Sequence, residues 1–190
     1  MLYARDRNPI ISLMAEDGIR TLSSALPILA HESTNMEARA NALYDAWLCG
    51  GCLEAVGMAL HHKLCHTLGG SFDLPHTETH PVMLPHAVAY NAVATPEAMA
   101  AISRALGAPD AAQGLFNLMR ALGVPLSRAE IGIPESAIDM AAEIAVKNPH
   151  WNSRPITRDA VRGLSYDPPH RPPGCSDPPA GALHGRPAPW

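Results

Sequence analysis

Histidines gather in one stretch of this 190-residue chain, and they are the side chains best suited to chemistry. Six of the ten lie between positions 61 and 86, namely His61, His62, His66, His76, His80 and His86. On a helix, His62 and His66 would share one face about one turn apart. Two imidazoles so placed can bind one metal ion, and an imidazole also transfers protons near neutral pH. The spacing by itself leaves both uses open.

The other histidines of this stretch are less specific. His76 follows a glycine pair and a predicted loop, so a turn can bring it back toward the same point. His61 directly precedes His62 and would point about 100° away from it on a helix, which favours a structural role. His86 is interpreted as a capping or packing residue. Single histidines are more often hydrogen-bonded or solvated than functional.

The chain contains one cysteine motif and neither of two common nucleotide-binding motifs. Cys49-Gly50-Gly51-Cys52 has the C-x-x-C spacing of redox and zinc sites, but no second cysteine pair accompanies it. We therefore interpret these residues as small, buried packing groups. Neither G-x-G-x-x-G nor G-x-x-x-x-G-K-[ST] occurs, so no residue of the chain is predicted to bind a nucleotide.

The elements that must position the histidines are predicted to be helices. Apolar residues recur with helical spacing, and no segment alternates with period two. The pattern predicts an all-α bundle, in which Gly69-Gly70 ends the helix of His62 and His66. Gly50-Gly51 either interrupts that segment or allows close helix packing. The predicted helices cover 9–30, 36–68, 81–90, 96–107, 110–123 and 135–147, with a loop at 71–79 and a short last helix after Thr157.

Composition narrows the class of partner. Apolar residues make up 47% of the chain, which can therefore bury a core, and the formal net charge of −4 offers no basic surface for nucleic acid. No apolar run is long enough to cross a membrane, and no secretory signal precedes the first helix. Four irregularly spaced cysteines fit a reducing cytoplasm. We expect a cytoplasmic protein that acts on a small molecule.

Composition also divides the chain. Residues 1–166 form the predicted helical domain, and residues 167–190 are predicted to be a disordered, Pro/Gly-rich tail. Eight prolines and three glycines fall between Pro168 and Trp190. Such a segment cannot bury enough apolar surface to offset the entropy of ordering it.

The histidine stretch resembles the iron-containing alcohol dehydrogenase superfamily. The resemblance rests on residues 57–70, on Leu74-Pro75-His76 and on residues 84–91, which match the pattern His-x-x-x-His-x-Leu-Gly, Pro-His and Leu-Pro-His with a Tyr-Asn close. The flanking Leu48-Cys49-Gly50 is most similar to the maleylacetate reductase branch. The resemblance extends from about residue 2 to about residue 164, and it implies the fold of the family's all-helical C-terminal domain.

The resemblance also implies an activity and roles for three residues. It implies reduction of maleylacetate to 3-oxoadipate with NADH or NADPH, in the catabolism of aromatic compounds. His62 and His76 are implied metal ligands, for iron or zinc acting as a Lewis acid, and His66 is the implied catalytic group. The family's nucleotide-binding domain precedes this region and is not in the chain. We therefore expect a truncated chain that is inactive alone.

Two other functions stay open. The chain could act as a metal-dependent alcohol dehydrogenase of the same superfamily, on an alcohol or aldehyde. It could also be a non-catalytic helical module that pairs with a separately encoded nucleotide-binding chain. A homodimer is a further expectation from the resemblance.

Overall fold

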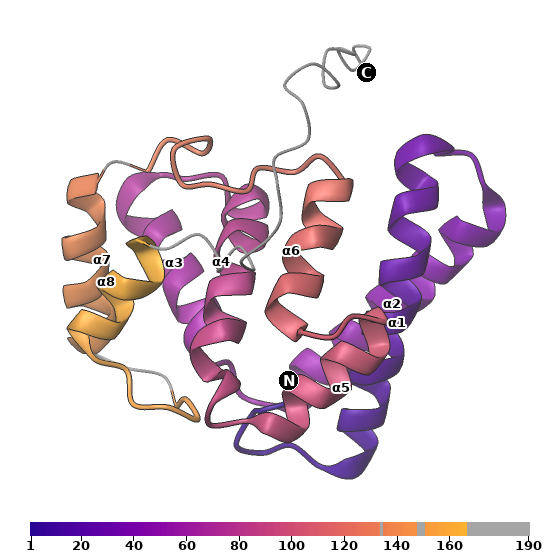
Figure 1. Cartoon of the computed structure of the whole chain (residues 1–190), viewed down its shortest axis with the longest axis horizontal. Helices are drawn as coiled ribbons and strands as arrows, with labels where there is room; N and C mark the ends of the chain where they lie inside the picture. The colour runs from indigo at the N-terminus through magenta and orange to yellow at the C-terminus, as the bar shows by residue number, and fades with distance from the viewer. Residues whose placement is uncertain (134, 148–150, 167–190) are drawn as a thin grey trace.

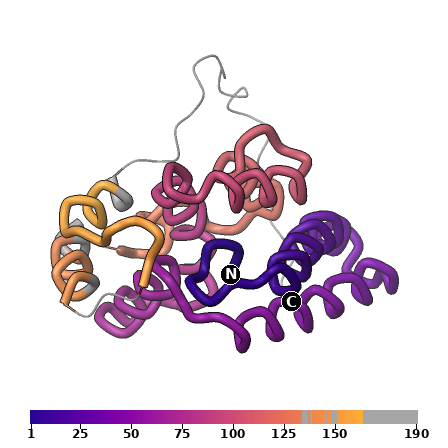
Figure 2. Tube along the Cα trace, turned by 90° about the horizontal axis from the view of Figure 1, so that it is seen from below, coloured from indigo at the N-terminus to yellow at the C-terminus, as the bar shows by residue number. Residues whose placement is uncertain are grey.

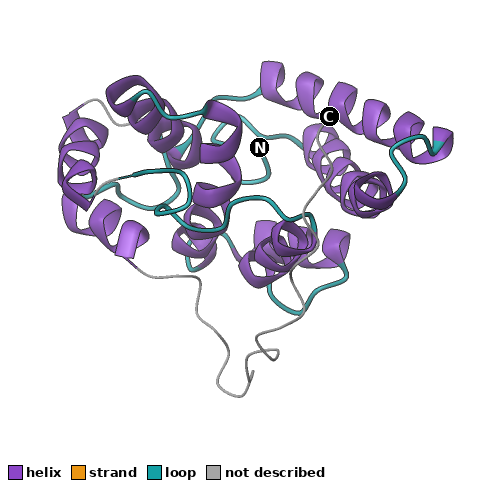
Figure 3. Ribbon diagram, turned by 90° about the horizontal axis from the view of Figure 1, so that it is seen from above, coloured by secondary structure: helices purple, strands orange, loops and turns teal. Residues whose placement is uncertain are grey.

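The computed structural model of the chain describes residues 1–133, 135–147 and 151–166. Within these ranges the regular elements are helices and no strand is present, which confirms the predicted all-α class (Figures 1 and 3). No helix in this part of the chain is long and apolar enough to cross a membrane. The predicted tail, 167–190, lies outside the described residues. The helices are α1 (Pro9–His31), α2 (Met36–Ala55), α3 (Leu60–Phe72), α4 (His76–Ala92), α5 (Pro96–Leu106), α6 (Ala111–Ala121), α7 (Glu135–Lys147) and α8 (Arg158–Tyr166).

Side-chain caps fix the beginnings of three helices. The Oδ1 atom of Asn8 accepts a hydrogen bond from the backbone N–H of Ile11 at 3.0 Å, and Pro9 follows as the first helical residue. Asn35 caps α2 through the N–H of Ala38, also at 3.0 Å. Asp110 caps α6 in the same way. These caps satisfy N–H groups that have no partner inside the helix, so the predicted starts of these helices are confirmed.

Helices α1 and α2 form a hairpin at one end of the molecule (Figure 1). They approach closely at Gly18, where an added Cβ would lie 2.5 Å from the Oδ1 atom of Asp45 on α2. Asp45 is almost fully buried, at 2% exposure, and its burial raises the pKa of the carboxyl group above the ordinary value. Only glycine leaves room for that carboxyl group between the two helices.

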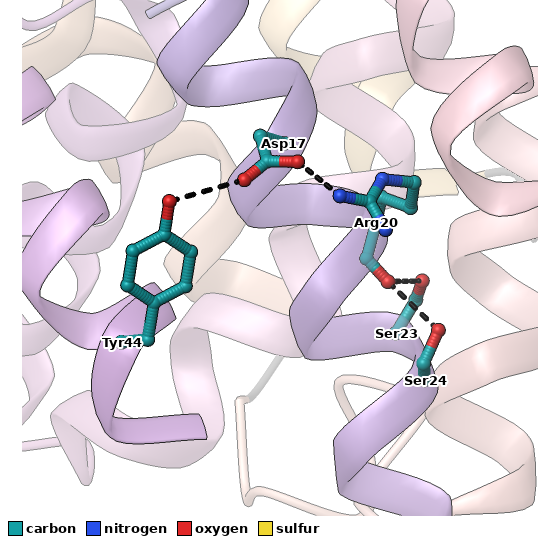
Figure 4. A network of polar contacts seen from close by, with 5 residues as sticks. All are labelled: Asp17, Arg20, Ser23, Ser24 and Tyr44. Carbon is teal, nitrogen blue, oxygen red and sulfur yellow. Dashed lines mark hydrogen bonds and ion pairs between the residues drawn. The ribbon is translucent and has the colours of Figure 1, made fainter. Parts of the chain in front are cut away.

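A small polar network supports the same hairpin (Figure 4). The Tyr44 hydroxyl of α2 donates to the Oδ2 atom of Asp17 on α1 at 3.3 Å, and the other oxygen of Asp17 pairs with Arg20. The hydroxyls of Ser23 and Ser24 both donate to the Arg20 carbonyl. These groups are exposed to solvent, so each contact contributes little to stability, and only the Tyr44–Asp17 hydrogen bond joins the two helices.

Neither glycine pair ends a helix, contrary to the prediction for Gly69-Gly70. Gly50-Gly51 lies inside α2, which ends at Ala55, and a break at residues 56–59 divides the predicted segment 36–68 into two helices. Gly69-Gly70 lies inside α3, which ends at Phe72, and Asp73 takes the left-handed conformation with φ 51°. Glycine is only about 1 kcal/mol less favourable than alanine in a helix, so tertiary packing overrides it.

The loop before His76 is also shorter than predicted. It covers residues 73–75 rather than 71–79, and α4 begins at His76 rather than at Pro81. Pro81 and Pro85 therefore lie inside the helix, where each removes a backbone hydrogen bond. The buried face of α4 offsets that loss by packing Val82, Met83, Ala87 and Val88 into the core.

Two clusters of buried side chains make up the core. One joins α1, α2, α5 and α6 with Val88 of α4, and it includes Leu2, Tyr3 and Ala4 of the N-terminal segment, which lies in the middle of the molecule (Figure 2). The other joins α3, α4, α7 and α8 around Leu60, Leu64 and Met83. The α3–α4 hairpin, which carries the histidines, is thus held by the second cluster.

Candidate functional site

The histidine site is built on the α3–α4 hairpin. Helix α3 contributes His61, His62 and His66, and α4 contributes His76 and His80. The buried residues of α3 include Leu60, Leu64, Cys65 and Leu68, and their burial fixes the rotation of the helix. The three-residue loop then folds α4 back along α3, so that histidines from both helices lie at one place.

The three residues singled out by sequence lie close together. The rings of His62 and His66 have centroids 6.2 Å apart, and the ring of His66 stacks on that of His76 at 5.7 Å and 28°. His66 and His76 are exposed, whereas His62 is half-buried. His66 is thus flanked by the two predicted metal ligands and is accessible from solvent. The roles of His62, His66 and His76 remain predictions.

His80 is a member of the cluster that the sequence analysis did not assign. Its ring lies 4.3 Å from that of His76 and 5.3 Å from that of His62, and its Nε2 atom is 3.0 Å from the Nε2 atom of His76. The two residues are four apart, the same spacing that singled out His62 and His66. The predicted loop at 71–79 concealed it, because the spacing has this meaning only on a helix.

His61 lies within the cluster, and it also has a structural contact. Its ring centroid is 5.3 Å from that of His62 and 4.9 Å from that of His80. Its Nε2–H donates to the backbone carbonyl of His80 at 3.1 Å. Because a carbonyl only accepts, this contact places the ring proton on Nε2 and leaves the lone pair on Nδ1. The short α3–α4 loop brings the His80 carbonyl within reach of His61.

Two imidazoles of the cluster are held in the neutral form. Burial lowers the pKa of His61 from 6.5 to about 4. Burial, together with the neighbouring imidazoles of His76, His62 and His66, lowers the pKa of His80 to about 4. A neutral imidazole keeps a lone pair at pH 7, which is the form that binds metal ions or accepts protons.

Cys65 lies beneath the same rings. It is fully buried, and burial raises the pKa of its thiol to about 12. Cys65 forms a group with His61 and His80, in which one possible ligand atom from each residue lies within 4.8 Å of the other two. Neither His62 nor His76 belongs to this group of three among the described residues. Two imidazoles without a carboxylate hold iron or zinc weakly, so His62 and His76 by themselves do not fit a catalytic metal ion.

A cavity of about 240 Å³ adjoins the histidines. His61 and His62 line part of it, and its walls are otherwise mostly apolar, with contributions from Tyr3, Met58 and Leu84. An apolar pocket beside a few polar groups is the usual form of a small-molecule site. The cavity therefore places space for a small ligand next to the imidazoles.

The C-x-x-C motif lies on α2, and the interpretation as buried packing residues holds for its cysteines but not for Gly50 and Gly51, which are exposed. Cys52 is fully buried, and Cys49 is half-buried with its Sγ atom 3.6 Å from the Asp45 carboxylate. Burial and that carboxylate raise the pKa of the Cys49 thiol to about 11. Such a thiol is not a reactive thiolate near neutral pH.

Comparison with known proteins gives a consistent result. The family described as Fe-containing alcohol dehydrogenase family, C-terminal, matches residues 1–166. The maleylacetate reductase of Burkholderia cepacia is 55% identical over 169 residues, which are 87% of this chain and 48% of that protein. The crystal structure of maleylacetate reductase from Agrobacterium tumefaciens has 52% identity and a TM-score of 0.83, over 86% of this chain and 46% of the other.

An iron-containing alcohol dehydrogenase has the same fold. The crystal structure of the Corynebacterium glutamicum protein superposes with a TM-score of 0.82 at 36% identity, over 88% of this chain and 49% of the other. This chain therefore spans about half the length of the relatives that it matches. The matched half is the predicted helical domain.

Proposed function

This chain belongs to the Fe-containing alcohol dehydrogenase family, and we propose that it supplies the C-terminal half of a maleylacetate reductase. The complete enzyme would use NADH or NADPH to reduce the carbon–carbon double bond of maleylacetate, giving 3-oxoadipate. The proposal rests above all on the identity of 48 to 55% with several maleylacetate reductases. The exposed His66 between His62 and His76 supports it with a suitable chemical group.

Each residue has a definite task in this proposal. A hydride from the nicotinamide adds to the alkene carbon that is β to the ketone, and the resulting enolate takes a proton at the carbon next to the ketone. His66 donates that proton, because its ring is exposed and lies next to the rings of both His62 and His76. His62 and His76 orient the His66 ring and the substrate carboxylates. The adjoining cavity excludes water from the apolar part of the substrate.

In this proposal the nucleotide binds outside the matched segment, as the family resemblance implies. Exposed apolar side chains on α1 and α2 support a contact with another domain, chain or second copy, as in a homodimer. Ile10, Leu13, Met36, Leu43 and Trp47 are each 68 to 75% exposed. Exposed apolar side chains that gather on one hairpin are more typical of an interaction surface than singly scattered ones. The free cysteines Cys49, Cys52 and Cys65 agree with a cytoplasmic enzyme.

A chimeric enzyme tests the proposal. Residues 1–166 replace the matching segment of the Burkholderia cepacia maleylacetate reductase, and NADH oxidation is followed with maleylacetate as substrate. We expect turnover by the chimera and very little by the isolated chain. His66→Ala should lower kcat by roughly 10²- to 10⁴-fold, as for loss of a general acid. His31→Ala, at the exposed end of α1, is the matched control and should change nothing.

The alternative functions give different results in the same assay. A chimera that oxidises short-chain alcohols with NAD⁺ and leaves maleylacetate unchanged would identify an alcohol dehydrogenase, the function suggested by the Corynebacterium glutamicum structure. A folded chimera inactive on both substrates would favour a non-catalytic module. Rapid turnover by the isolated chain would contradict the need for a nucleotide-binding half.

A further inference from the structure

The group formed by His61, Cys65 and His80 has the donor set of a soft or borderline metal ion. Two imidazole nitrogens and one sulfur lie within 4.8 Å of one another. Thiolate and imidazole ligands favour Zn²⁺ and Co²⁺, whereas Mg²⁺, Ca²⁺ and Mn²⁺ prefer oxygen. This ligand set shares no residue with the predicted pair His62 and His76.

The hydrogen bonds around the group leave a ring nitrogen of each histidine available to bind an ion. His61 donates its Nε2–H to the backbone carbonyl of His80, which leaves the Nδ1 lone pair available. The Nε2 atom of His80 is paired with that of His76 at 3.0 Å. When His80 donates in that pair, its own Nδ1 also keeps a lone pair. Histidine ligands in proteins commonly donate their second ring N–H to a carbonyl or another acceptor, which fixes the ring.

The position of the group also suits an ion. His61 and Cys65 are four residues apart on α3, so both face the partner helix, and His80 approaches from α4. Cys65 is fully buried and the two histidines are half-buried, so competing water is limited. In a tetrahedral zinc site the ligand atoms are about 3.5 Å apart, so binding requires the side chains to move together by about 1 Å.

We propose that His61, Cys65 and His80 bind one zinc-class divalent cation, with the fourth position open toward the adjoining cavity. The cation displaces the thiol proton of Cys65, which leaves to solvent, and the sulfur binds as thiolate. His61 lines this cavity. An ion there would clamp α3 to α4 and present a Lewis acid to a ligand in the cavity. The proposal goes beyond the proposed function and does not depend on it.

Cobalt binding to the full chain tests the site. The protein is reduced with a phosphine, stripped with a chelator and titrated with CoCl₂, and the near-ultraviolet thiolate-to-cobalt charge-transfer band is recorded. We expect the band to saturate at one Co²⁺ per chain, with no response to MgCl₂. Cys65→Ser should abolish the band, and His61→Gln and His80→Gln should each weaken binding at least tenfold.

Matched variants separate this site from the other candidates. Cys49→Ser, Cys52→Ser and Cys175→Ser should each keep the band, which would show that no other thiol is the ligand. His62→Gln should also keep it. Loss of cobalt binding in His62→Gln with full binding in Cys65→Ser would place the ion on the predicted pair and overturn the proposal.

One measurement needs no variant and therefore does not depend on whether Cys65→Ser folds. X-ray absorption of the zinc-loaded wild-type chain should show one sulfur at about 2.3 Å among nitrogen or oxygen neighbours. A zinc shell of nitrogen and oxygen alone, or no stoichiometric zinc, would overturn the proposal. Neither result depends on reductase activity, so the site can fail while the proposed function stands.

Discussion

Replacing Gly70 with alanine tests how the histidine-bearing helix ends. Sequence patterns predicted that Gly69-Gly70 stops the helix, whereas in the structure α3 continues to Phe72 and Gly70 is an exposed helical residue. An added Cβ at Gly70 meets nothing within 4 Å. The substitution therefore changes only backbone freedom and helix propensity.

The expected effect is a gain in stability. Alanine is more favourable than glycine inside a helix by about 0.8–1.0 kcal/mol, and no clash subtracts from it. We therefore expect Gly70→Ala to raise the free energy of unfolding by about 1 kcal/mol. With the slope usual for urea denaturation, the midpoint should rise by about 0.5 M.

Gly107→Ala is the matched control. Gly107 ends α5 in the left-handed conformation, with φ 61°, and an added Cβ there also meets nothing within 4 Å. Both variants add the same methyl group to open space, but only this one forces alanine into a disfavoured conformation. We expect it to lower the free energy of unfolding by about 1 kcal/mol. Urea unfolding of both variants, followed by circular dichroism, measures the difference.

A loss of stability in Gly70→Ala as large as that in Gly107→Ala would refute this reasoning. It would mean that Gly70 takes the left-handed conformation and that the helix ends there. Helix α4 would then follow a longer loop, and the stacking of His76 on His66 would lose its structural basis.

Three further predictions concern packing, protonation and thiol reactivity. Gly114→Ala should lower the free energy of unfolding by about 1 kcal/mol or more, because its Cβ would lie 2.7 Å from that of Ala108, and a stabilised variant would contradict this packing. Between pH 6.5 and 4 the unfolded state binds a proton at His61 that the folded state does not, so metal-free protein should lose stability as the pH falls, by about 3 kcal/mol from this residue. Urea unfolding across that range should show that the free energy of unfolding depends less on pH in His61→Gln than in the wild-type chain. An unchanged slope would argue against the lowered pKa of His61. In a Cys175→Ser background, Cys65 and Cys49 should resist a thiol reagent at about pH 8 and react after unfolding, because their pKa values are about 12 and about 11; rapid labelling of the folded chain would show that these thiols are accessible.

The sequence determined the features that depend on neighbours along the chain. Helix starts at Asn8, Asn35 and Asp110 were predictable because a cap bonds an N–H three residues away. The left-handed end of α5 at Gly107 was predictable for a similar reason. Residue order alone also carried the resemblance to the iron-containing alcohol dehydrogenases, because the histidine pattern is compact in sequence.

Tertiary packing decided the helix boundaries wherever the local sequence signals opposed it. Glycine pairs signal helix ends, yet they lie inside α2 and α3. Prolines signal helix starts, yet Pro81 and Pro85 lie inside α4. The buried faces of these helices outweigh the local cost of these residues, which is about 1 to 3 kcal/mol. The same packing shortened the α3–α4 loop to three residues. That loop places His80 beside His61 and Cys65, a proximity that no spacing along the chain encodes, because it arises from the side-by-side packing of two helices.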